Sequence, residues 1–217
     1  MKKRWVIGID EVGRGPLAGP VTVAAVAAQI FNFSAQGGSA SGGQFSIFNK
    51  FPMNQFPIFK TIKDSKKLSA LQRRKWNKII RHNFLSSIQS VSPSIIDRKG
   101  ISHATRLAVS RCLQKLATNY KLQTTNFEIL LDGGLHAPPE YMHQQTIIKG
   151  DERVPIIAAA SIVAKVHRDR YMVRLHKKYP MYGFDRHKGY GTVMHREAIQ
   201  KHGLSEYHRQ SFCQFLA

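Results

Sequence analysis

Acidic residues are scarce in this sequence. Its 217 residues include 13 Asp or Glu against 33 Lys or Arg, so the formal net charge is +20. A basic excess of this size favours a polyanionic partner, either nucleic acid or an anionic membrane surface. The few acids that are present therefore need a reason.

Cysteines and long hydrophobic runs are also rare. Cys112 and Cys213 are the only cysteines and have no CxxC spacing, which argues against a disulfide framework and against a cysteine zinc site. The longest run of small apolar residues, Val21–Phe31, is shorter than the roughly 20 residues of a membrane span. No signal-peptide pattern follows the basic N-terminus. We expect a monomeric cytoplasmic protein that contacts nucleic acid and no membrane.

Strand and helix patterns alternate along the chain, which is typical of a layered α/β fold. Strands are predicted at 4–10, 20–30, 127–131 and 146–148, and helices at 68–88, 102–120 and 155–179. Ser92-Pro93-Ser94 is expected to break the first helix, and residues 179–191 to form a loop before a short helix and tail. The segment 32–60 is rich in Gly, Ser, Phe and Pro, and we interpret it as a long inserted surface loop.

Carboxylates stand where predicted strands end. Asp10 and Glu11 close one strand, Asp132 closes another, and Asp151 lies where a strand gives way to a helix. Strand ends carry the chemistry of such folds. Four carboxylates at one edge would repel one another unless cations held them, and hard oxygen ligands suit Mg²⁺ or Mn²⁺. On a polyanion-binding surface this pattern indicates phosphodiester hydrolysis with two metal ions.

Eight motifs in this order closely resemble the type 2 ribonuclease H family, bacterial ribonuclease HII in particular. They are GIDEVGRGPLAGPV (8–21), DSKKLS (64–69), ILLDG (129–133), KGD (149–151), AASIVAKV (159–166), RDR (168–170), RHKGYGT (186–192) and HRQSF (208–212). Together they span nearly the whole chain. The segment 32–60 departs from the family pattern because it is longer than the family needs.

The resemblance implies a fold, an activity and a site. The fold would be the ribonuclease H-like mixed sheet flanked by helices, in a catalytic domain over 1–180, with a helical region over 181–217 completing the substrate site. The family hydrolyses the RNA strand of RNA–DNA hybrids and nicks duplex DNA 5′ to an embedded ribonucleotide, leaving a 3′-hydroxyl and a 5′-phosphate. Its four metal-binding acids align with Asp10, Glu11, Asp132 and Asp151.

Substrate contacts are predicted at six further positions. Gly13, Arg14 and Gly15 suit a rigid backbone reader of the ribose 2′-hydroxyl, since glycine allows close approach and a positive φ; a plain tight turn is the alternative. Tyr190 would pack against the sugar on the 3′ side of the ribonucleotide, as its family counterpart does, or belong to the core. Lys66 and Lys165 are predicted to contact phosphates, or are solvated charges.

Several alternatives stay open at this point. The tail QSFCQFLA (210–217) would bind a sliding clamp or dock on its own domain. Asp97, Asp169 and Asp185 are interpreted as caps or surface charges. A junction resolvase, a type 3 ribonuclease H and a non-catalytic nucleic-acid binding module are rival functions. The type 3 enzyme carries a separate N-terminal domain, which we do not expect because the first acid is residue 10. The binding module leaves the four acids unexplained.

Overall fold

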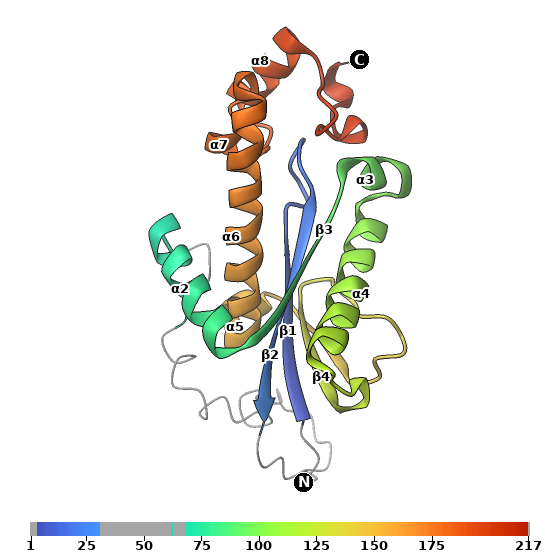
Figure 1. Cartoon of the computed structure of the whole chain (residues 1–217). Coiled ribbons are helices and arrows are strands. Elements are labelled where there is room, and N and C mark those ends of the chain that lie inside the picture. Colours follow the sequence, from blue (N-terminus) through green and yellow to red (C-terminus); the bar gives the residue numbers. More distant parts are fainter. Residues whose placement is uncertain (1–3, 31–61, 63–67, 217) are drawn as a thin grey trace.

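The computed structural model describes residues 4–30, 62 and 68–216. Among these residues five strands form one sheet, and helices cover both of its faces (Figure 1). The strands are β1 (Arg4–Val12), β2 (Val21–Ile30), β3 (Leu85–Val91), β4 (Phe127–Asp132) and β5 (Gln144–Ile147). The helices are α2 (Ala70–Asn83), α3 (Pro93–Lys99), α4 (Ile101–Tyr120), α5 (Gly150–Arg153), α6 (Pro155–Lys178), α7 (Phe184–His187) and α8 (Val193–His202), with 3₁₀ turns η4 (Thr124–Asn126), η5 (Pro180–Tyr182), η6 (Gln210–Phe212) and η7 (Gln214–Leu216).

The sheet is mixed, with the strand order β3-β2-β1-β4-β5. The β1–β2 and β2–β3 pairs are antiparallel, whereas β1–β4 and β4–β5 are parallel. The predicted α/β class, a mixed sheet flanked by helices, is confirmed. The parallel pairing matters for the site because it brings the carboxyl ends of β1, β4 and β5 to one edge.

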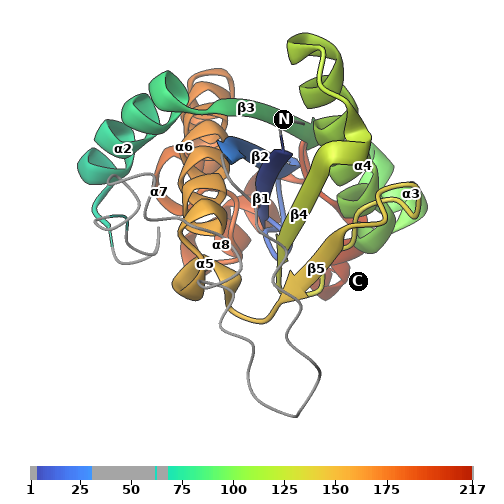
Figure 2. The same ribbon diagram turned by 90° about the horizontal axis from the view of Figure 1, so that it is seen from below.

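Two cores sandwich the sheet. On one face α6 packs against β1 and β2, with α2 beside α6; on the other face α4 covers β2 and β3 (Figure 2). Helix α6 approaches the sheet closely at Gly8, where a Cβ atom would lie 2.3 Å from the Ile156 carbonyl oxygen. A larger residue at position 8 would push this helix outward, so Gly8 sets the distance between α6 and the acid-bearing end of β1.

The predicted helix over 68–88 is wrong in its last turns. Helix α2 ends at Asn83, and the chain becomes extended at Phe84 to form β3. The spacing of the apolar residues Leu85, Ile88 and Val91 is compatible with a helix and with an edge strand, so it does not distinguish these two structures. The ladder with β2, in which Ser87 pairs with Ala25, decided it. No local pattern reports such a partner, which lies about 60 residues away in the sequence.

The remaining predicted elements lie close to their expected positions. β1, β2, β4, β5, α4 and α6 all occur, with ends that differ by one or two residues. Ser92 and Pro93 do separate two elements, but they also begin α3, with Ser92 as N-cap and Pro93 in its first turn. The expected loop over 179–191 contains η5 and α7. The predicted insertion over 32–60 lies outside the described residues.

Candidate active site

Two acids lie side by side at the carboxyl ends of neighbouring parallel strands. The register pairs Ile9 of β1 with Leu131 of β4, so the next residues along the two strands are Asp10 and Asp132. Glu11 follows in β1. One carboxylate oxygen from each of Asp10, Glu11 and Asp132 lies within 4.8 Å of the other two. The structure therefore brings together three of the four predicted metal-binding acids.

Burial makes this cluster electrostatically unfavourable without a cation. Burial raises the pKa of Asp10 well above its usual range, and the neighbouring Glu11 carboxylate raises it further. Burial also raises the pKa of Glu11, against the Arg14 guanidinium, whose Nη1 lies 3.7 Å from Glu11 Oε1. A hydrogen bond with Ser161 of α6 favours the charged form of Asp10. Since the donors are all carboxylates, the set fits a hard divalent cation.

Asp151 reaches the same edge from α5. Its backbone N–H donates to Asp132 Oδ1 over 3.2 Å, and its side chain is buried. Gly150 makes this approach feasible, because a Cβ there would lie 2.7 Å from Ile157 Cδ1 and 3.2 Å from Asp132 Oδ1. Asp151 is thus next to the cluster, although its carboxylate is not one of the three groups within 4.8 Å of one another.

The turn Gly13–Gly15 follows directly on the acids and is held by a buried arginine. Arg209 is fully buried, and its guanidinium donates to the carbonyl oxygens of Gly13 (2.6 Å), Arg14 (2.7 Å) and Gly19 (2.8 Å). Gly15 is exposed and makes no hydrogen bond to any other residue that the structure describes. The turn is therefore fixed from below and open toward solvent at Gly15.

A second buried arginine closes the other side of the turn. Arg168 of α6 donates to the carbonyl oxygens of Pro20 (3.0 Å), Ala18 (3.1 Å) and Lys188 (2.9 Å). Gly13 has a φ of 90°, and a Cβ atom there would lie 2.3 Å from Arg168 Nε. The positive φ that the sequence suggested for this turn thus belongs to Gly13, whereas Gly15 is outside that region.

Tyr190 lies on the loop that packs against the same turn. The Gly189 carbonyl oxygen accepts from Leu17 N–H over 2.8 Å, which ties the two loops together. The Tyr190 side chain is 43% exposed, and its ring lies 5.9 Å from the Arg168 guanidinium carbon. The core alternative for Tyr190 is therefore wrong, and the ring is available to a ligand that reaches the turn.

Comparison with known proteins assigns the family. The model of the family described as Ribonuclease HII matches residues 7–34 and 52–215. The ribonuclease HII of Caldicellulosiruptor bescii is 39% identical over 210 residues, which cover 96% of this chain and 86% of that protein. The chain belongs to the ribonuclease HII family. It is accordingly a type 2 ribonuclease H, a hydrolase with endonuclease activity on the RNA of RNA–DNA hybrids.

Solved structures agree with this ribonuclease HII assignment. The ribonuclease HII in the PCNA complex from Archaeoglobus fulgidus has a TM-score of 0.65 and 25% identity, covering 95% of this chain and 93% of that one. Bst-RNase HIII in complex with Mn²⁺ has a TM-score of 0.63 and 18% identity, covering 96% and 64%. The second likeness shows the shared fold alone. The resemblance drawn from the motifs is confirmed, and the ribonuclease HII family match excludes the non-catalytic module.

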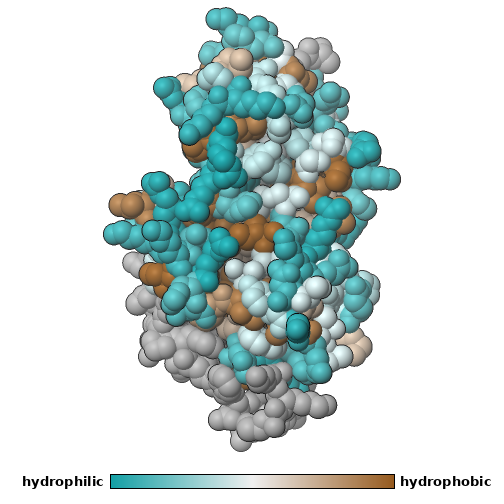
Figure 3. Space-filling view, viewed as in Figure 1, coloured by the Kyte–Doolittle hydropathy of each residue, from teal (hydrophilic) through white to brown (hydrophobic). Residues whose placement is uncertain are grey.

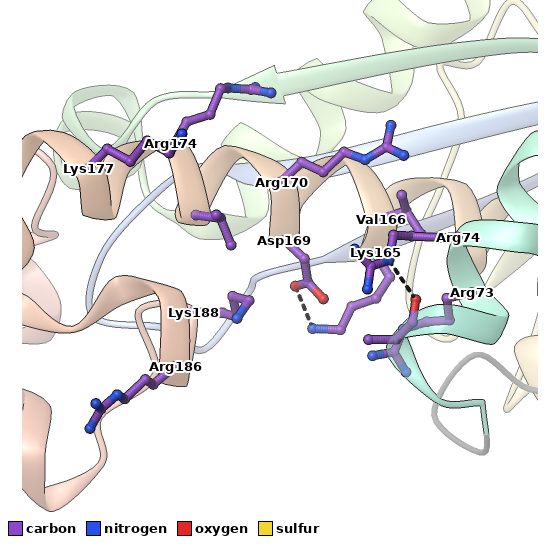
Figure 4. Close-up of a pocket in the computed structure, with 12 residues that line it drawn as sticks. Arg73, Arg74, Lys165, Val166, Asp169, Arg170, Arg174, Lys177, Arg186 and Lys188 are labelled. Atoms are coloured by element: carbon purple, nitrogen blue, oxygen red, sulfur yellow. Dashed lines mark hydrogen bonds and ion pairs between the residues drawn. The ribbon is translucent and has the colours of Figure 1, made fainter.

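A basic groove runs along α6 from the active site of this ribonuclease HII. It encloses about 600 Å³ between α2, α6 and the α7 region. Hydrophilic side chains gather on this face (Figure 3), and the close-up shows the basic side chains spread around the groove, with Lys165 turned toward Asp169 (Figure 4). The cations that line it are Arg73, Arg74, Lys165, Arg170, Arg174, Lys177, Arg186 and Lys188. Lys165 is one helical turn beyond Ser161, which contacts Asp10, so the groove begins about one turn of α6 away from the acids.

Lys165 is partly engaged within the groove. Its Nζ lies 2.7 Å from Asp169 Oδ1, the one acid among the described lining residues (Figure 4). A phosphate would share this ammonium with Asp169 or displace the carboxylate. Lys66, the other predicted phosphate contact, lies outside the described residues.

The three acids interpreted as structural have structural partners. Asp97 accepts from the backbone N–H groups of Gln210 and Ser211, each over 3.1 Å, and Asp185 lies 3.2 Å from His176 Nδ1. The tail docks on its own domain as far as Cys213, which is buried. Phe215 is exposed on one side and faces the Arg196 guanidinium at 4.9 Å.

Arg168 and Arg209 are the residues that sequence reasoning missed. Both belong to quoted motifs, but the sequence alone does not distinguish a buried arginine, whose guanidinium donates to carbonyl oxygens, from a solvated arginine. Their neighbours in the chain are polar, His167 and Asp169 for Arg168 and His208 and Gln210 for Arg209, which favoured a surface interpretation. No helix in the described ranges, 4–30 and 68–216, combines the length with the apolarity that a bilayer span needs.

Proposed function

We propose that this ribonuclease HII nicks duplex DNA on the 5′ side of an embedded ribonucleotide, as well as cutting RNA in hybrids, by a two-metal-ion reaction that leaves a 3′-hydroxyl and a 5′-phosphate. One observation carries the proposal. Three carboxylates with oxygens within 4.8 Å of one another adjoin a backbone turn that is open at Gly15. The acids supply a cation site, and the turn supplies a contact for a single ribose.

Asp10, Glu11, Asp132 and Asp151 would hold the metal ions. Bound Mg²⁺ or Mn²⁺ would activate the attacking water and stabilise the leaving oxygen. Bst-RNase HIII, which shares this fold, was solved in complex with Mn²⁺, and this supports a divalent metal ion as the cofactor. Asp10 is oriented by Ser161, and Asp132 by the amide of Asp151. These contacts fix two of the ligands before any ion binds.

Gly13–Gly15 and Tyr190 would select the ribonucleotide. The 2′-hydroxyl is the group that distinguishes RNA from DNA. Because Arg209 already occupies the carbonyls of Gly13 and Arg14, the open backbone of Gly15 is the best placed to contact this hydroxyl. Arg209 also keeps the turn rigid, so little ordering entropy is lost when the ribose binds. The half-exposed Tyr190 ring would pack against the sugar.

The basic groove would bind the phosphates of the duplex. Among the described residues, eight cations and one acid line it, so binding there would be independent of sequence and sensitive to salt. This division explains how the enzyme could bind any duplex yet cut only where a ribose reaches the turn. Lys165 lies between the part of the surface that would bind phosphates and the part that would cleave the substrate.

The test compares matched variants on a duplex with one ribonucleotide. Asp132→Asn should lose cleavage and the rise in Tm caused by Mn²⁺, while its affinity for all-DNA duplex changes little. Glu152→Gln removes an exposed acid next to Asp151 and should behave as the unmodified enzyme does. Near-normal cleavage by Asp132→Asn, or an unchanged Mn²⁺ effect on its Tm, would contradict the metal assignment.

A secondary proposal concerns the tail. The Archaeoglobus complex of ribonuclease HII with PCNA supports a sliding-clamp contact, and we place this contact on the residues that follow Cys213. Phe215 is the exposed aromatic there. Phe215→Ala should weaken binding to the clamp in surface plasmon resonance without changing cleavage of free duplex. Unchanged clamp binding, or none by the unmodified enzyme, contradicts this proposal.

A further inference from the structure

Three histidines lie together beneath the loop that carries Tyr190. His195 of α8 and His208 are buried, and the His187 ring stacks on the His195 ring with centroids 4.3 Å apart. None of them belongs to the acidic cluster or to the basic groove. Their hydrogen bonds nevertheless determine how the backbone of this loop is held.

A backbone amide fixes the direction of these bonds. Ser205 N–H donates to His208 Nδ1 over 2.9 Å, and the Ser205 hydroxyl lies 2.8 Å from the same nitrogen. Because an amide can only donate, Nδ1 is the unprotonated nitrogen of a neutral His208 ring, and the proton is on Nε2. That Nε2 lies 3.1 Å from His195 Nε2, so His208 donates and His195 accepts.

The direction of the hydrogen bonds continues from His195 to the backbone of Tyr190. With Nε2 as acceptor, a neutral His195 carries its proton on Nδ1, which lies 2.9 Å from the Tyr190 carbonyl oxygen. A carbonyl can only accept, so donor and acceptor agree at every step. Burial lowers the pKa of His195 and of His208 to about 4, with a further contribution from the nearby His187, so both rings are neutral at pH 7.

We propose that His208 and His195 are positioning residues that form a directional hydrogen-bond relay from Ser205 to the Tyr190 backbone. This inference rests on the proposed role of Tyr190 at the ribonucleotide sugar. The Tyr190 ring is 43% exposed and faces the Arg168 guanidinium at 5.9 Å on its covered side, so the backbone from which the ring projects helps to set its position. The relay thereby couples a buried pair of rings to substrate selection.

His187 supports the same loop by a parallel arrangement. Gly189 N–H donates to His187 Nδ1 over 3.2 Å, which leaves the His187 Nε2 proton to the Tyr182 carbonyl oxygen at 2.7 Å. Both stacked rings are then neutral, with their tautomers set by backbone amides. Gly189 in turn accepts from Leu17, so His187 also supports the contact with the segment that follows the turn beside the acids.

The first test measures tautomers in the unmodified enzyme without substrate. Ring ¹⁵N chemical shifts at pH 7 should report the Nε2–H form for His208 and the Nδ1–H form for His195. A His195 ring in the Nε2–H form, or exchanging between both forms, overturns the relay. This measurement does not depend on activity or on the folding of any variant.

The second test uses two variants that each keep one bond. His195→Asn places an amide where Nδ1 was and can still donate to Tyr190, whereas His195→Gln reaches only toward His208. We expect His195→Asn to retain cleavage at a single ribonucleotide, and His195→Gln to lose about three- to tenfold in kcat, the effect of one neutral hydrogen bond. Affinity for all-DNA duplex should stay unchanged in both.

A double-mutant cycle separates positioning from general support of the fold. If His195 acts through Tyr190, His195→Gln should cause no further loss in a Tyr190→Ala background. Additive losses, or equal losses in the Asn and Gln variants, overturn the positioning role alone. Normal cleavage by Tyr190→Ala overturns the sugar-packing proposal and the positioning role together, and the tautomer measurement then still reports whether the relay exists.

Discussion

Gly13 and Gly15 lie two residues apart in the same turn, yet alanine should affect them through different physics. At Gly13 a methyl group would lie 2.3 Å from Arg168 Nε, at a φ of 90°. Arg168 cannot retreat, because three carbonyl oxygens hold its guanidinium. At Gly15 the φ is not positive, and a methyl group would meet no atom of the described residues within 4 Å.

The expected magnitudes follow from these surroundings. A non-glycine residue at positive φ costs about 1–2 kcal/mol, and overpacking a buried site costs about 1–3 kcal/mol. Gly13→Ala should therefore lose roughly 2–5 kcal/mol of unfolding free energy, or about 5–15 °C in Tm for a domain of this size. Gly15→Ala should stay within about 2 °C of the unmodified enzyme, since surface substitutions change stability by about 0.5 kcal/mol or less.

Substrate selection should be affected at Gly15, although the stability of the protein should be affected at Gly13. The Gly15 methyl would point at the proposed ribose site, so Gly15→Ala should nick a single-ribonucleotide duplex about tenfold more slowly, a loss of about 1.4 kcal/mol in transition-state stabilisation. Calorimetry gives the Tm values. Nicking rates on the single-ribonucleotide duplex and affinities for all-DNA duplex, measured at one salt concentration, give the effect on substrate selection. The reasoning is refuted if Gly15→Ala cuts normally, or if it weakens binding to all-DNA duplex as much as it slows nicking.

Three further changes test the electrostatics. Asp10→Asn should abolish cleavage yet raise the Tm in EDTA by relieving repulsion; a lower Tm in EDTA contradicts this. Arg209→Met should cost at least about 3 kcal/mol in urea unfolding, since three carbonyls lose a charged donor, while Lys177→Met, in the open groove, should cost little. The pKa of His208 is lowered to about 4 from 6.5, so its folded form resists protonation. The stability advantage over His208→Asn is therefore complete above pH 6.5 and shrinks as the pH falls through 4; a constant difference contradicts the neutral ring.

Much of this site can be read from the sequence because its acids mark strand ends. Asp10, Glu11 and Asp132 follow runs of apolar residues whose strand character is unambiguous, and parallel pairing then brings them together. Their proximity follows from the topology of the fold, which the motif resemblance supplied. The structure also distinguishes Asp151, which contacts Asp132 through its backbone amide.

Other features depend on contacts that no local pattern records. The segment 85–91 is a strand because it pairs with β2. Its serines and spaced apolar residues would fit a helix equally well. Arg168 and Arg209 are buried because their guanidinium groups donate to carbonyl oxygens of a segment more than 140 residues away in the sequence. The tautomer of His195 follows from its contact with His208, 13 residues along the chain, which only the folded chain brings into reach.

One measurement tests the central claim most directly. An end-labelled DNA duplex with a single internal ribonucleotide is incubated with the unmodified enzyme and Mg²⁺ or Mn²⁺, and the product ends are mapped to the nucleotide. The account predicts one nick on the 5′ side of the ribonucleotide, with a 3′-hydroxyl and a 5′-phosphate, and none in EDTA or with Asp132→Asn. A nick elsewhere, a cyclic phosphate end, or cleavage that persists in EDTA would contradict it.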